Sequence, residues 1–405
     1  VPSAQVCNRF YWVIRQITGA CAWDIHYAAA EAQLRGEDVI VLSVGDPDFA
    51  THSEICETAV DALRAGDTHY THVLGRPKLR EAIAARQSLL QGIAVHADNI
   101  ALVAGAQNGL FAACLCLFSH GDEVLVPEPM YLTYEACVQA SGARIKTVEQ
   151  PAANGFRLTR TALQAAITDK TRGIALATPC NPTGNVYCRE ELEAVAEVAR
   201  AHDLWVICDE VYGQLIYDDQ HLSISALPGM AERTVVLNSL SKSHAMTGWR
   251  VGWVAGPPTL ISHLENLLLC MIYGLPGFIQ AAALKALELD EVVVSDARAL
   301  YRRRRDLVVN ELSAISDLEC RVPQAGMFML VDVRRTGLTG REFAWQLYRQ
   351  TGVSVLDAQA FGPSAEGFVR VSFTVADDTL REACRRIAGF VEGLGANAAP
   401  LRDRR

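Results

Sequence analysis

One lysine lies among hydroxyl side chains directly after an apolar run of the chain. The run Thr234–Leu237 is followed by Ser239, Ser241 and Lys242, and Arg250 stands just before the next apolar run. A lysine amine can form a Schiff base with an aldehyde, and hydroxyls together with a guanidinium can hold a phosphate. Pyridoxal 5′-phosphate (PLP) is an aldehyde that carries a phosphate, so this stretch predicts a PLP site.

The same stretch fits a second chemistry. Ser239 and Lys242 have the spacing of the Ser-x-x-Lys motif of β-lactamases and penicillin-binding proteins, in which the serine is acylated. The partner motif Ser-Asp-Asn is missing, and Lys170-Thr-Arg does not match Lys-Thr-Gly. A dinucleotide-dependent oxidoreductase would need G-x-G-x-x-G after a strand, and a PLP-binding transcription regulator would need a basic helix-turn-helix. The sequence favours PLP chemistry over all three.

Two turn segments follow other apolar runs. Gly105, Ala106 and Gln107 come after the run Ile100–Ala104 and open a helical pattern. The N-terminus of a helix offers free N–H groups and the positive end of a dipole to an anion. Asn181 stands in an Asn-Pro turn, where its amide could donate to an oxygen of the cofactor. Either segment taken alone is also the pattern of an ordinary tight turn.

Charged and phenolic residues that could bind a ligand lie at or near two other predicted strands. Asp209 and Tyr212 end the apolar run Trp205–Cys208. A carboxylate at the end of a buried strand is costly unless it meets a cation, and a protonated pyridine nitrogen is such a cation. Arg370 stands on the alternating run Phe368–Phe373, where its guanidinium could bind a carboxylate bidentately. The alternatives are a helix cap for Asp209 and a structural salt bridge for Arg370.

Short apolar runs alternate with helical patterns over about residues 100 to 255. The expected strands are Ile100–Ala104, Glu123–Val126, Arg144–Val148, Gly173–Ala177, Trp205–Cys208, Thr234–Leu237 and Val251–Ala255. This alternation predicts an α/β fold in which a mostly parallel sheet of seven strands lies between helices. The carboxyl ends of such strands are where this class of fold binds ligands, so the motifs above are expected to meet there.

After the large sheet the pattern changes to a smaller α+β domain. A long charged helix is expected around residues 290–315, and its run Arg302–Arg305 is interpreted as a solvated face. A strand Met327–Val333, a pair of strands around Val353–Val355 and Phe368–Phe373, and a last helix Asp378–Leu394 follow. We expect an N-terminal arm at 1–22, a small domain at 23–50 and 300–405, and a large PLP-binding domain at 51–299.

The composition of the chain indicates which binding partners and which cellular compartment to expect. The 405 residues are 50% hydrophobic and carry a net charge of −9, which favours neither nucleic acid nor an anionic membrane as a partner. The 12 cysteines include no C-x-x-C pair, and we expect reduced thiols in a cytoplasmic protein. His69 and His72 lack the ligand pattern of a metal site, so no metal is expected.

The order of these features resembles the fold-type I aminotransferases, the aspartate aminotransferase superfamily of PLP enzymes. That order is a Gly turn, an Asn-Pro turn, Asp-x-x-Tyr, Ser-x-Ser-Lys with Arg, and a late Arg. Three upstream segments extend it: Ser43-Val-Gly-Asp-Pro-Asp-Phe, the stretch from Tyr70 to Leu79-Arg80, and Pro127-Glu-Pro-Met-Tyr-x-x-Tyr134. The resemblance covers about residues 22 to 395.

The resemblance implies a role for each matching residue in the cofactor site. Lys242 would form the Schiff base and move a proton between substrate and cofactor, Asp209 would keep the ring nitrogen protonated, and Tyr131 would stack on the ring. Asn181 and Tyr212 would hydrogen-bond the ring oxygen. The phosphate would be held at the Gly105 turn by Ser239, Ser241, Arg250 and the backbone N–H groups of Ala106 and Gln107.

The resemblance also implies how substrates and subunits are arranged. Arg370, helped by Asn181 and the backbone of Gly45, would hold the α-carboxylate of an amino acid or a 2-oxo acid. Tyr70 would reach the phosphate of the neighbouring subunit, so a homodimer with shared sites is expected. One departure concerns Asp357-Ala358, which stands where many members have Pro-Gly; this puts the local shape of that small-domain turn in question.

Other segments resemble more narrowly the bacterial aminotransferases that act on arginine and pyruvate. They begin at Ala22, Leu42, Ala201, Leu237, Tyr301, Ala360 and Leu380. This implies L-arginine as the amino donor and pyruvate as the acceptor. A cationic side chain needs acceptors in its pocket, and Asp24 is the candidate carboxylate, with Glu128 and Glu210 as competitors and a helix cap as the alternative for Asp24. Transamination of another or modified amino acid, and a PLP-dependent lyase or oxidase reaction, stay open.

Overall fold

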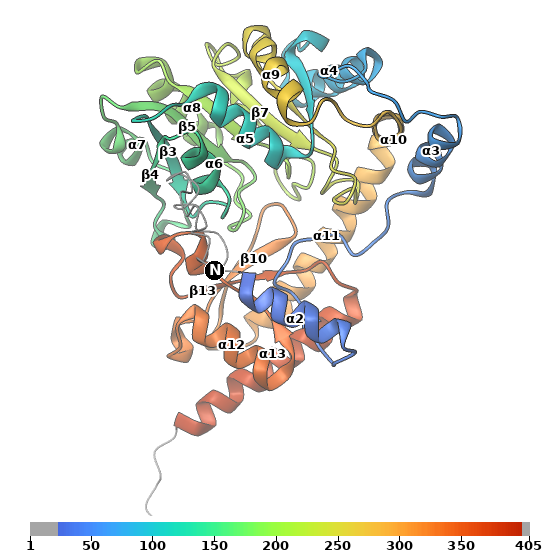
Figure 1. Ribbon diagram of the computed structural model, residues 1–405. Helices are drawn as coiled ribbons and strands as arrows, with labels where there is room; N and C mark the ends of the chain where they lie inside the picture. Colours follow the sequence, from blue (N-terminus) through green and yellow to red (C-terminus); the bar gives the residue numbers. More distant parts are fainter. Residues whose placement is uncertain (1–22, 399–405) are drawn as a thin grey trace, which may run out of the picture.

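The structure, a computed structural model, describes residues 23–398, and its centre is a seven-stranded sheet in the order β2-β8-β7-β6-β5-β3-β4 (Figure 1). The strands are β2 (Ile100–Val103), β3 (Glu123–Glu128), β4 (Arg144–Glu149), β5 (Thr171–Ala177), β6 (Trp205–Asp209), β7 (Thr234–Ser239) and β8 (Gly252–Ala255). Neighbouring strands pair in parallel, except that β8 is antiparallel to both β2 and β7. The predicted α/β fold with a mostly parallel seven-stranded sheet is confirmed.

Helices cover both faces of this sheet. They are α3 (Ser53–Arg64), α4 (Pro77–Gln91), α5 (Ala106–Leu117), α6 (Tyr134–Ala140), α7 (Arg160–Ala166), α8 (Arg189–Ala201), α9 (Pro258–Met271) and α10 (Gly277–Glu288). Successive strand residues enter different cores, because side chains alternate across a strand. On β2, Ala101 and Val103 pack in the core that includes α5 and α9, whereas Ile100 and Leu102 pack with α4 and α10.

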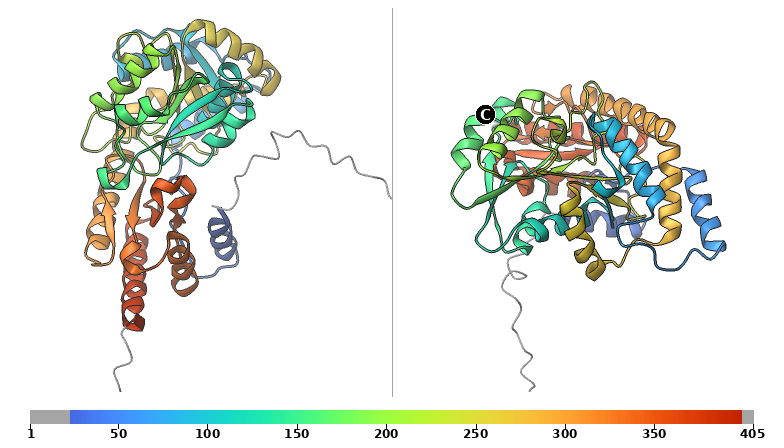
Figure 2. Two further views of the ribbon diagram at one scale, coloured as in Figure 1. Left: turned by 90° about the vertical axis from the view of Figure 1, so that its left-hand side faces the viewer. Right: turned by 90° about the horizontal axis from the view of Figure 1, so that it is seen from above.

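A second, smaller group of elements lies beside the large sheet (Figures 1 and 2). Its antiparallel sheet has the order β12-β13-β10-β9, and a parallel pair joins β1 to β11. These strands are β1 (Ile40–Val41), β9 (Glu319–Arg321), β10 (Phe328–Asp332), β11 (Val353–Ser354), β12 (Leu356–Asp357) and β13 (Phe368–Ser372). The accompanying helices are α2 (Asp24–Leu34), α11 (Asp290–Ser313), α12 (Gly340–Thr351) and α13 (Asp377–Ala398).

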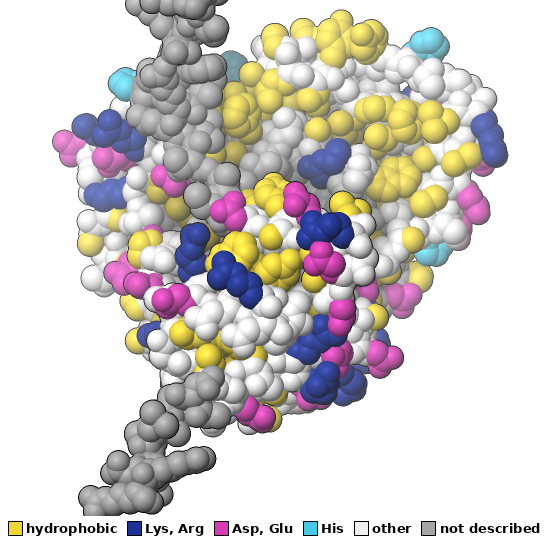
Figure 3. All heavy atoms as spheres, turned by 60° about the horizontal axis from the view of Figure 1, so that its bottom comes forward, with side chains coloured by type: hydrophobic (Ala, Val, Ile, Leu, Met, Phe, Trp, Pro, Cys, Tyr) yellow, Lys and Arg dark blue, Asp and Glu magenta, His cyan; other side chains and the backbone are white. Residues whose placement is uncertain are grey.

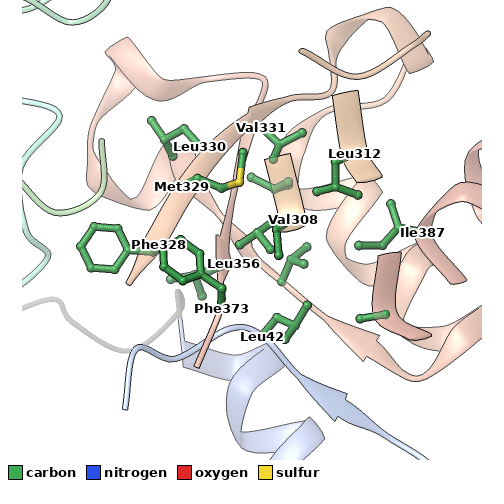
Figure 4. Close-up of a cluster of buried hydrophobic side chains, with 14 of the residues drawn as sticks. Leu42, Val308, Leu312, Phe328, Met329, Leu330, Val331, Leu356, Phe373 and Ile387 are labelled. Atoms are coloured by element: carbon green, nitrogen blue, oxygen red, sulfur yellow. The ribbon is translucent and has the colours of Figure 1, made fainter. Parts of the chain in front are cut away.

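The smaller group surrounds a hydrophobic core that also includes a few residues of the larger part, such as Phe156 and Tyr212 (Figure 4). Phe328 and Leu330 on β10 and Phe373 after β13 are at most 1% exposed in this cluster. Leu42 after β1 and Val308 on α11 join it from distant parts of the sequence. The segment around β1 is therefore packed against the C-terminal elements and not against the large sheet.

One predicted strand pairing is wrong. The strands expected around Val353–Val355 and Phe368–Phe373 do not pair with each other directly. Val353–Ser354 pairs in parallel with Ile40–Val41, and the next short strand, Leu356–Asp357, pairs with β13. An apolar pattern indicates that a segment can form a strand, but it does not indicate with which other strand the segment pairs.

The interpretation of Arg302–Arg305 as a solvated face is wrong for two of its members. The side chains of Arg304 and Arg305 are 6% and 7% exposed. Arg304 donates to both carboxylate oxygens of Asp48, at 2.6 and 2.8 Å. Arg305 donates to Asp218 at 2.7 Å. Successive residues of a helix point about 100° apart, so a run of arginines on a packed helix must turn some of them inward.

Helix α11 connects the two groups of elements and runs without a break past residue 300 (Figure 1). The predicted domain limits, 23–50 with 300–405 and 51–299, stay a prediction, and the predicted arm at 1–22 and the basic end at 401–405 lie outside the described residues. Figure 3 shows basic and acidic side chains interspersed on the face that carries the smaller group. No helix within residues 23–398 is both long enough and apolar enough to cross a bilayer.

Candidate active site

A cavity of about 430 Å³ lies at the carboxyl ends of β5, β6 and β7 and is bordered by the smaller sheet. Most of the predicted site residues line it, although they come from distant parts of the sequence. They are Gly45, Ala106, Gln107, Tyr131, Asn181, Asp209, Tyr212, Ser239, Ser241, Lys242, Arg250 and Arg370. The cavity has the size of a small-molecule site and the position at which α/β sheets bind ligands.

Lys242 reaches the cavity from the turn that follows β7. Its Nζ donates a hydrogen bond to the backbone carbonyl of Gly45 at 2.8 Å. Burial first, and then the positive charges of Arg370 and Arg250, lower the pKa of Lys242 to about 8 against the opposing effect of Asp46 and Asp209. A fraction of this amine is therefore neutral near pH 8 and able to act as a nucleophile or a base.

Asp209 ends β6 with its carboxylate inside the cavity. One oxygen accepts a hydrogen bond from the backbone N–H of Val211 at 3.1 Å, and the other accepts one from the hydroxyl of Tyr134 at 3.3 Å. Burial raises the pKa of Asp209 to about 6 in spite of both donors. The donors are neutral, so a cation in the cavity would stabilise the ionised carboxylate.

One end of the cavity is built for an anion. Gly105 caps α5 with φ of 83°, and the residues that follow it, Ala106 and Gln107, line the cavity at the helix N-terminus. A Cβ at Gly105 would collide with the guanidinium of Arg250, which contacts the turn closely. Arg250 itself has φ of 55° and donates to the carbonyl of Ala104 at 3.1 Å, which fixes it beside this helix end.

The Arg370 guanidinium lies at another end of the cavity and is 2% exposed. It donates to Oδ1 of Asn181 at 3.1 Å and to the carbonyl of Ser43 at 2.8 Å. Its Nε is buried without a partner, and no carboxylate of the described residues forms an ion pair with it. Burial lowers the pKa of Arg370. A buried guanidinium with a free donor and no anionic partner suits a bound carboxylate better than a structural salt bridge.

Two tyrosines and an amide line the space between these ends. Burial raises the pKa of both Tyr131 and Tyr212, so both phenols stay protonated at neutral pH. The ring of Tyr212 is packed edge-on against Phe328 at 5.3 Å between centroids, which fixes its orientation. Because Oδ1 of Asn181 already accepts from Arg370, the amide N–H₂ of Asn181 is left for another acceptor.

Other cavity residues were not assigned from the sequence. They are Trp23, His26, Val44, Asp46, Tyr134, Ala177, Val211 and Thr247. Tyr134 is the clearest omission, because it bonds to Asp209 and stands three positions after Tyr131 in one of the segments that carry the family resemblance. A buried tyrosine on a short helix beside a strand end is a signal for such a contact, since its hydroxyl needs a partner.

Three predicted residues do not line the cavity. Gly105 lies behind it as the cap of α5, Tyr70 is 85% exposed and packs its ring against Tyr273 at 4.7 Å, and Asp24 is exposed on the first turn of α2. The competitors of Asp24 are buried outside the cavity. Glu128 accepts from the backbone and the hydroxyl of Ser364, while Glu210 accepts from the Ser223 hydroxyl and lies 2.9 Å from His221.

The chemistry of the cavity fits PLP. Its phosphate would lie at the α5 end, where donors and Arg250 meet, and its protonated ring nitrogen would meet the buried Asp209 carboxylate. Lys242 is the lysine that lines the cavity and has an amine of lowered pKa. No group of three or more potential metal ligands occurs among the described residues, and His72 lies 3.6 Å from Glu265.

Comparisons with known proteins identify the family of the chain. Residues 37–387 match the family model of aminotransferase class I and II. The chain is 52% identical over 370 residues to the arginine–pyruvate transaminase of Pseudomonas aeruginosa, covering 91% of this chain and 94% of that one. The aspartate aminotransferase of Pyrococcus abyssi is 38% identical over 87% of this chain and 91% of its own length.

Solved structures show the same fold. The aspartate aminotransferase of Thermus thermophilus with maleate has a TM-score of 0.90 and 31% identity, covering 94% of this chain and 99% of that one. An aromatic aminotransferase from Pyrococcus horikoshii has a TM-score of 0.85 and 36% identity, covering 90% and 99%. The chain therefore belongs to the aminotransferase class I and II family, the PLP-dependent aminotransferases of fold type I.

Proposed function

We propose that this aminotransferase moves the α-amino group of L-arginine to pyruvate. The observation that carries the amino-transfer site is one cavity lined by Lys242, Asp209 and Arg370, a buried guanidinium with no carboxylate partner among the described residues. The donor and acceptor are supported by 52% identity to a relative named as an arginine–pyruvate transaminase. An amino acid and a 2-oxo acid are the substrates of the family as a class.

The cavity residues divide between the cofactor and the substrate. When bound, PLP supplies an electron-withdrawing ring that makes the proton on the substrate Cα acidic. Ser239, Ser241, Arg250 and the N-terminus of α5 would hold its phosphate, and Asp209 its ring nitrogen. The amide of Asn181 and the hydroxyl of Tyr212 would donate to the ring oxygen, and Tyr131 would cover the ring face.

Lys242 is proposed to attach the cofactor and then to move the proton. Its lowered pKa leaves neutral amine available to accept the proton from the substrate Cα. With a 2-oxo acid as the acceptor, the same Nζ returns a proton to Cα. The carbonyl of Gly45, which accepts from Nζ at 2.8 Å, restrains the amine in the cavity between these steps.

Arg370 is proposed to orient both substrates by their α-carboxylate. Its Nε is buried and unpaired, and Asn181 and the carbonyl of Ser43 fix the plane of its guanidinium. Arginine and pyruvate share the carboxylate and differ in the side chain, so one guanidinium can serve both half-reactions. The guanidinium carbon also lies 5.0 Å from the ring centroid of Phe361 and 5.5 Å from that of Phe328, as in cation–π contacts.

We further propose a homodimer in a reducing compartment, the cytoplasm. Tyr70 is exposed and does not line the cavity of its own chain, which suits a role in the phosphate site of a neighbouring subunit. Ten cysteines of the described residues carry free thiols, a composition typical of cytoplasmic proteins.

Incubation with two substrates tests the proposed reaction. The purified protein, loaded with PLP, is given L-arginine and pyruvate, and alanine and 2-oxo-5-guanidinopentanoate are measured. We expect both products in equal amounts, and neither from the variant Lys242→Ala. Turnover of aspartate or an aromatic amino acid with none of arginine would refute the arginine assignment and leave the family intact. Release of CO₂ or ammonia in place of alanine would refute amino transfer.

A further inference from the structure

The proposed donor carries a guanidinium, and the residue predicted to bind it does not line the cavity. Asp24 is exposed on the first turn of α2. Asp209, one of the carboxylates in the cavity, is engaged by Tyr134 and Val211 at the ring end. Asp46, the other carboxylate that lines the cavity, acts on Lys242, whose pKa its charge raises. With both carboxylates near the cofactor-binding groups, we look for the side-chain subsite among the other residues that face the cavity.

The same helix presents two rings to the cavity. Trp23 is the N-cap residue of α2, and His26 stands three positions later, so both fall on one helix face. Their ring centroids are 5.6 Å apart and the ring planes meet at 72°, an edge-to-face packing that orients each ring. Asp24 lies between them in sequence and therefore points elsewhere.

His26 is connected to the carboxylate-binding end. Its Nδ1 lies 3.2 Å from the hydroxyl of Ser43, which is 3.2 Å from the hydroxyl of Ser354. The carbonyl of the same Ser43 accepts from Arg370 at 2.8 Å. The His26 ring is thus held at a fixed place relative to the guanidinium that orients the substrate.

The protonation of His26 suits a cationic neighbour. Burial, and then the charge of Arg370, lower the pKa of His26, so its ring is neutral at pH 7. Nδ1 of His26 and the Ser43 hydroxyl share a hydrogen bond, and in the tautomer in which Nδ1–H is the donor, the other ring nitrogen, Nε2, carries a lone pair. A neutral imidazole in this tautomer accepts a hydrogen bond from a guanidinium and does not repel it.

We propose that Trp23 and His26 form the subsite for the cationic end of the donor side chain. The face of Trp23 binds the guanidinium by a cation–π contact, and Nε2 of His26 accepts one of its N–H groups. This inference rests on the proposed arginine donor. It assigns the selection of the donor to two neutral rings of α2 instead of a carboxylate.

Three donors separate the contributions of charge, hydrogen bonding and shape. L-citrulline is nearly isosteric with L-arginine but uncharged, and L-norleucine has neither charge nor side-chain donors. For Trp23→Leu we expect kcat/KM for arginine to fall by about 3- to 30-fold, and for citrulline and norleucine by less than about 3-fold. For His26→Phe we expect losses with arginine and citrulline and little change with norleucine.

Matched variants distinguish a subsite for the cation from a general disturbance of the cavity. Asp24→Asn changes the exposed residue between the two rings and is expected to leave all three donors unchanged. Trp23→Phe keeps an aromatic face and should retain most of the preference for arginine over citrulline. KM for pyruvate in the half-reaction back to alanine should stay within about 2-fold in every variant, because pyruvate has no cationic side chain to bind in this subsite. A higher KM would indicate that the substitution disturbs the whole cavity.

Two results would overturn the inference. Either Trp23→Leu lowers kcat/KM for arginine, citrulline and norleucine in parallel, or Asp46→Asn, at the other carboxylate of the cavity, removes the preference for arginine while Trp23→Leu leaves it intact. Failure of the proposed function looks different, because the wild-type protein would then turn over other donors and not arginine. In that case the wild type would show no preference for arginine over citrulline, and the proposed subsite would be refuted together with the proposed donor.

Discussion

At the residue scale, the site depends on two groups whose environments move their pKa values toward neutrality from opposite sides. Burial lowers the pKa of Lys242 to about 8 and raises that of Asp209 to about 6. Each shift reflects the cost of an ionised group in the cavity without a bound partner. PLP would bring Asp209 its cation and Lys242 its carbonyl partner, so the cavity is prepared for the cofactor.

The first prediction concerns the rate of cofactor attachment. The neutral amine of Lys242 is the nucleophile, so the second-order rate of PLP uptake by the apoprotein should rise with pH and reach half its maximum near pH 8. Stopped-flow absorbance between pH 6 and pH 10 measures this. A midpoint near pH 10.5, the ordinary value for lysine, would contradict the proposed environment of the amine.

The second prediction concerns Asp209→Asn. A carboxyl whose folded pKa is raised stabilises the fold only while it is protonated, so its ionisation above about pH 6 costs stability. The apoprotein of Asp209→Asn should therefore be more stable than wild type at pH 8 by about 1–3 kcal/mol, and the difference should shrink toward pH 5. Urea unfolding at both pH values measures it.

The same variant should lose function. Without a negative charge beside the ring nitrogen, PLP binding should stabilise Asp209→Asn less than wild type, and transamination should fall by at least about 100-fold. Equal stabilities of the two apoproteins at pH 8, or full activity of the variant, would contradict the role given to this carboxylate.

Parts of the site were predictable at this scale because they combine a strand end with a chemically distinctive side chain. Lys242, Asp209 and Arg370 carry that signal in the sequence, and all three line one cavity. Asp24 was predicted from its charge, but its neighbours Trp23 and His26 face the cavity. Which face of α2 points toward the cavity could not be predicted from the sequence, because the elements against which α2 packs lie far along the chain.

At the element scale, a buried arginine joins helix α11 to two segments that are far from it in the sequence. Arg304 binds Asp48, near the N-terminal end, and Asp377, at the start of α13, at 3.2 Å. Charge alone suggested a solvated surface for this run. The partners of Arg304 are remote in sequence, so no local pattern could have identified them.

The third prediction compares two adjacent arginines of α11 that share a partner. Arg304→Ala should lower the free energy of unfolding by about 2 kcal/mol or more, since it leaves Asp48 partly buried and unpaired. Arg303→Ala, whose side chain is 61% exposed, should cost less than about 1 kcal/mol. Urea unfolding of both variants measures the difference. Equal losses would show that burial of Arg304 does not matter for stability.

The strands of the large sheet were predictable to within a few residues, whereas pairing in the smaller group was not. The runs around β5 and β6 are almost continuously apolar, which is typical of strands buried on both faces. The two-residue strands β1 and β11 are too short to carry a pattern, and their pairing joins residues more than three hundred positions apart. Such contacts depend on the whole fold.

At the scale of the whole molecule, the central proposal beyond one chain is a dimer with shared sites. The fourth prediction uses mixed dimers of Lys242→Ala and Tyr70→Ala. If Tyr70 completes the neighbouring subunit's site, each mixed dimer contains one site with both residues intact. Activity after subunit exchange should then exceed that of either parent and approach about a quarter of wild type.

The control for this experiment is the double variant, Lys242→Ala with Tyr70→Ala in one chain, mixed with wild type. In that mixture neither site of a mixed dimer is intact, so activity should fall below the dilution expected for independent subunits. Activity equal to the average of the parents in both mixtures would show that Tyr70 does not act across an interface.

The position of the covalent cofactor tests the proposed active site most directly. The chain has Lys78, Lys146, Lys170, Lys242 and Lys285, which serve as internal controls for one another. The holoprotein is reduced with borohydride and digested, and the peptides are identified by mass spectrometry. We predict a reduced PLP adduct on Lys242 that L-arginine removes when it is added before the borohydride. An adduct on another lysine, or none, would contradict the assignment of Lys242.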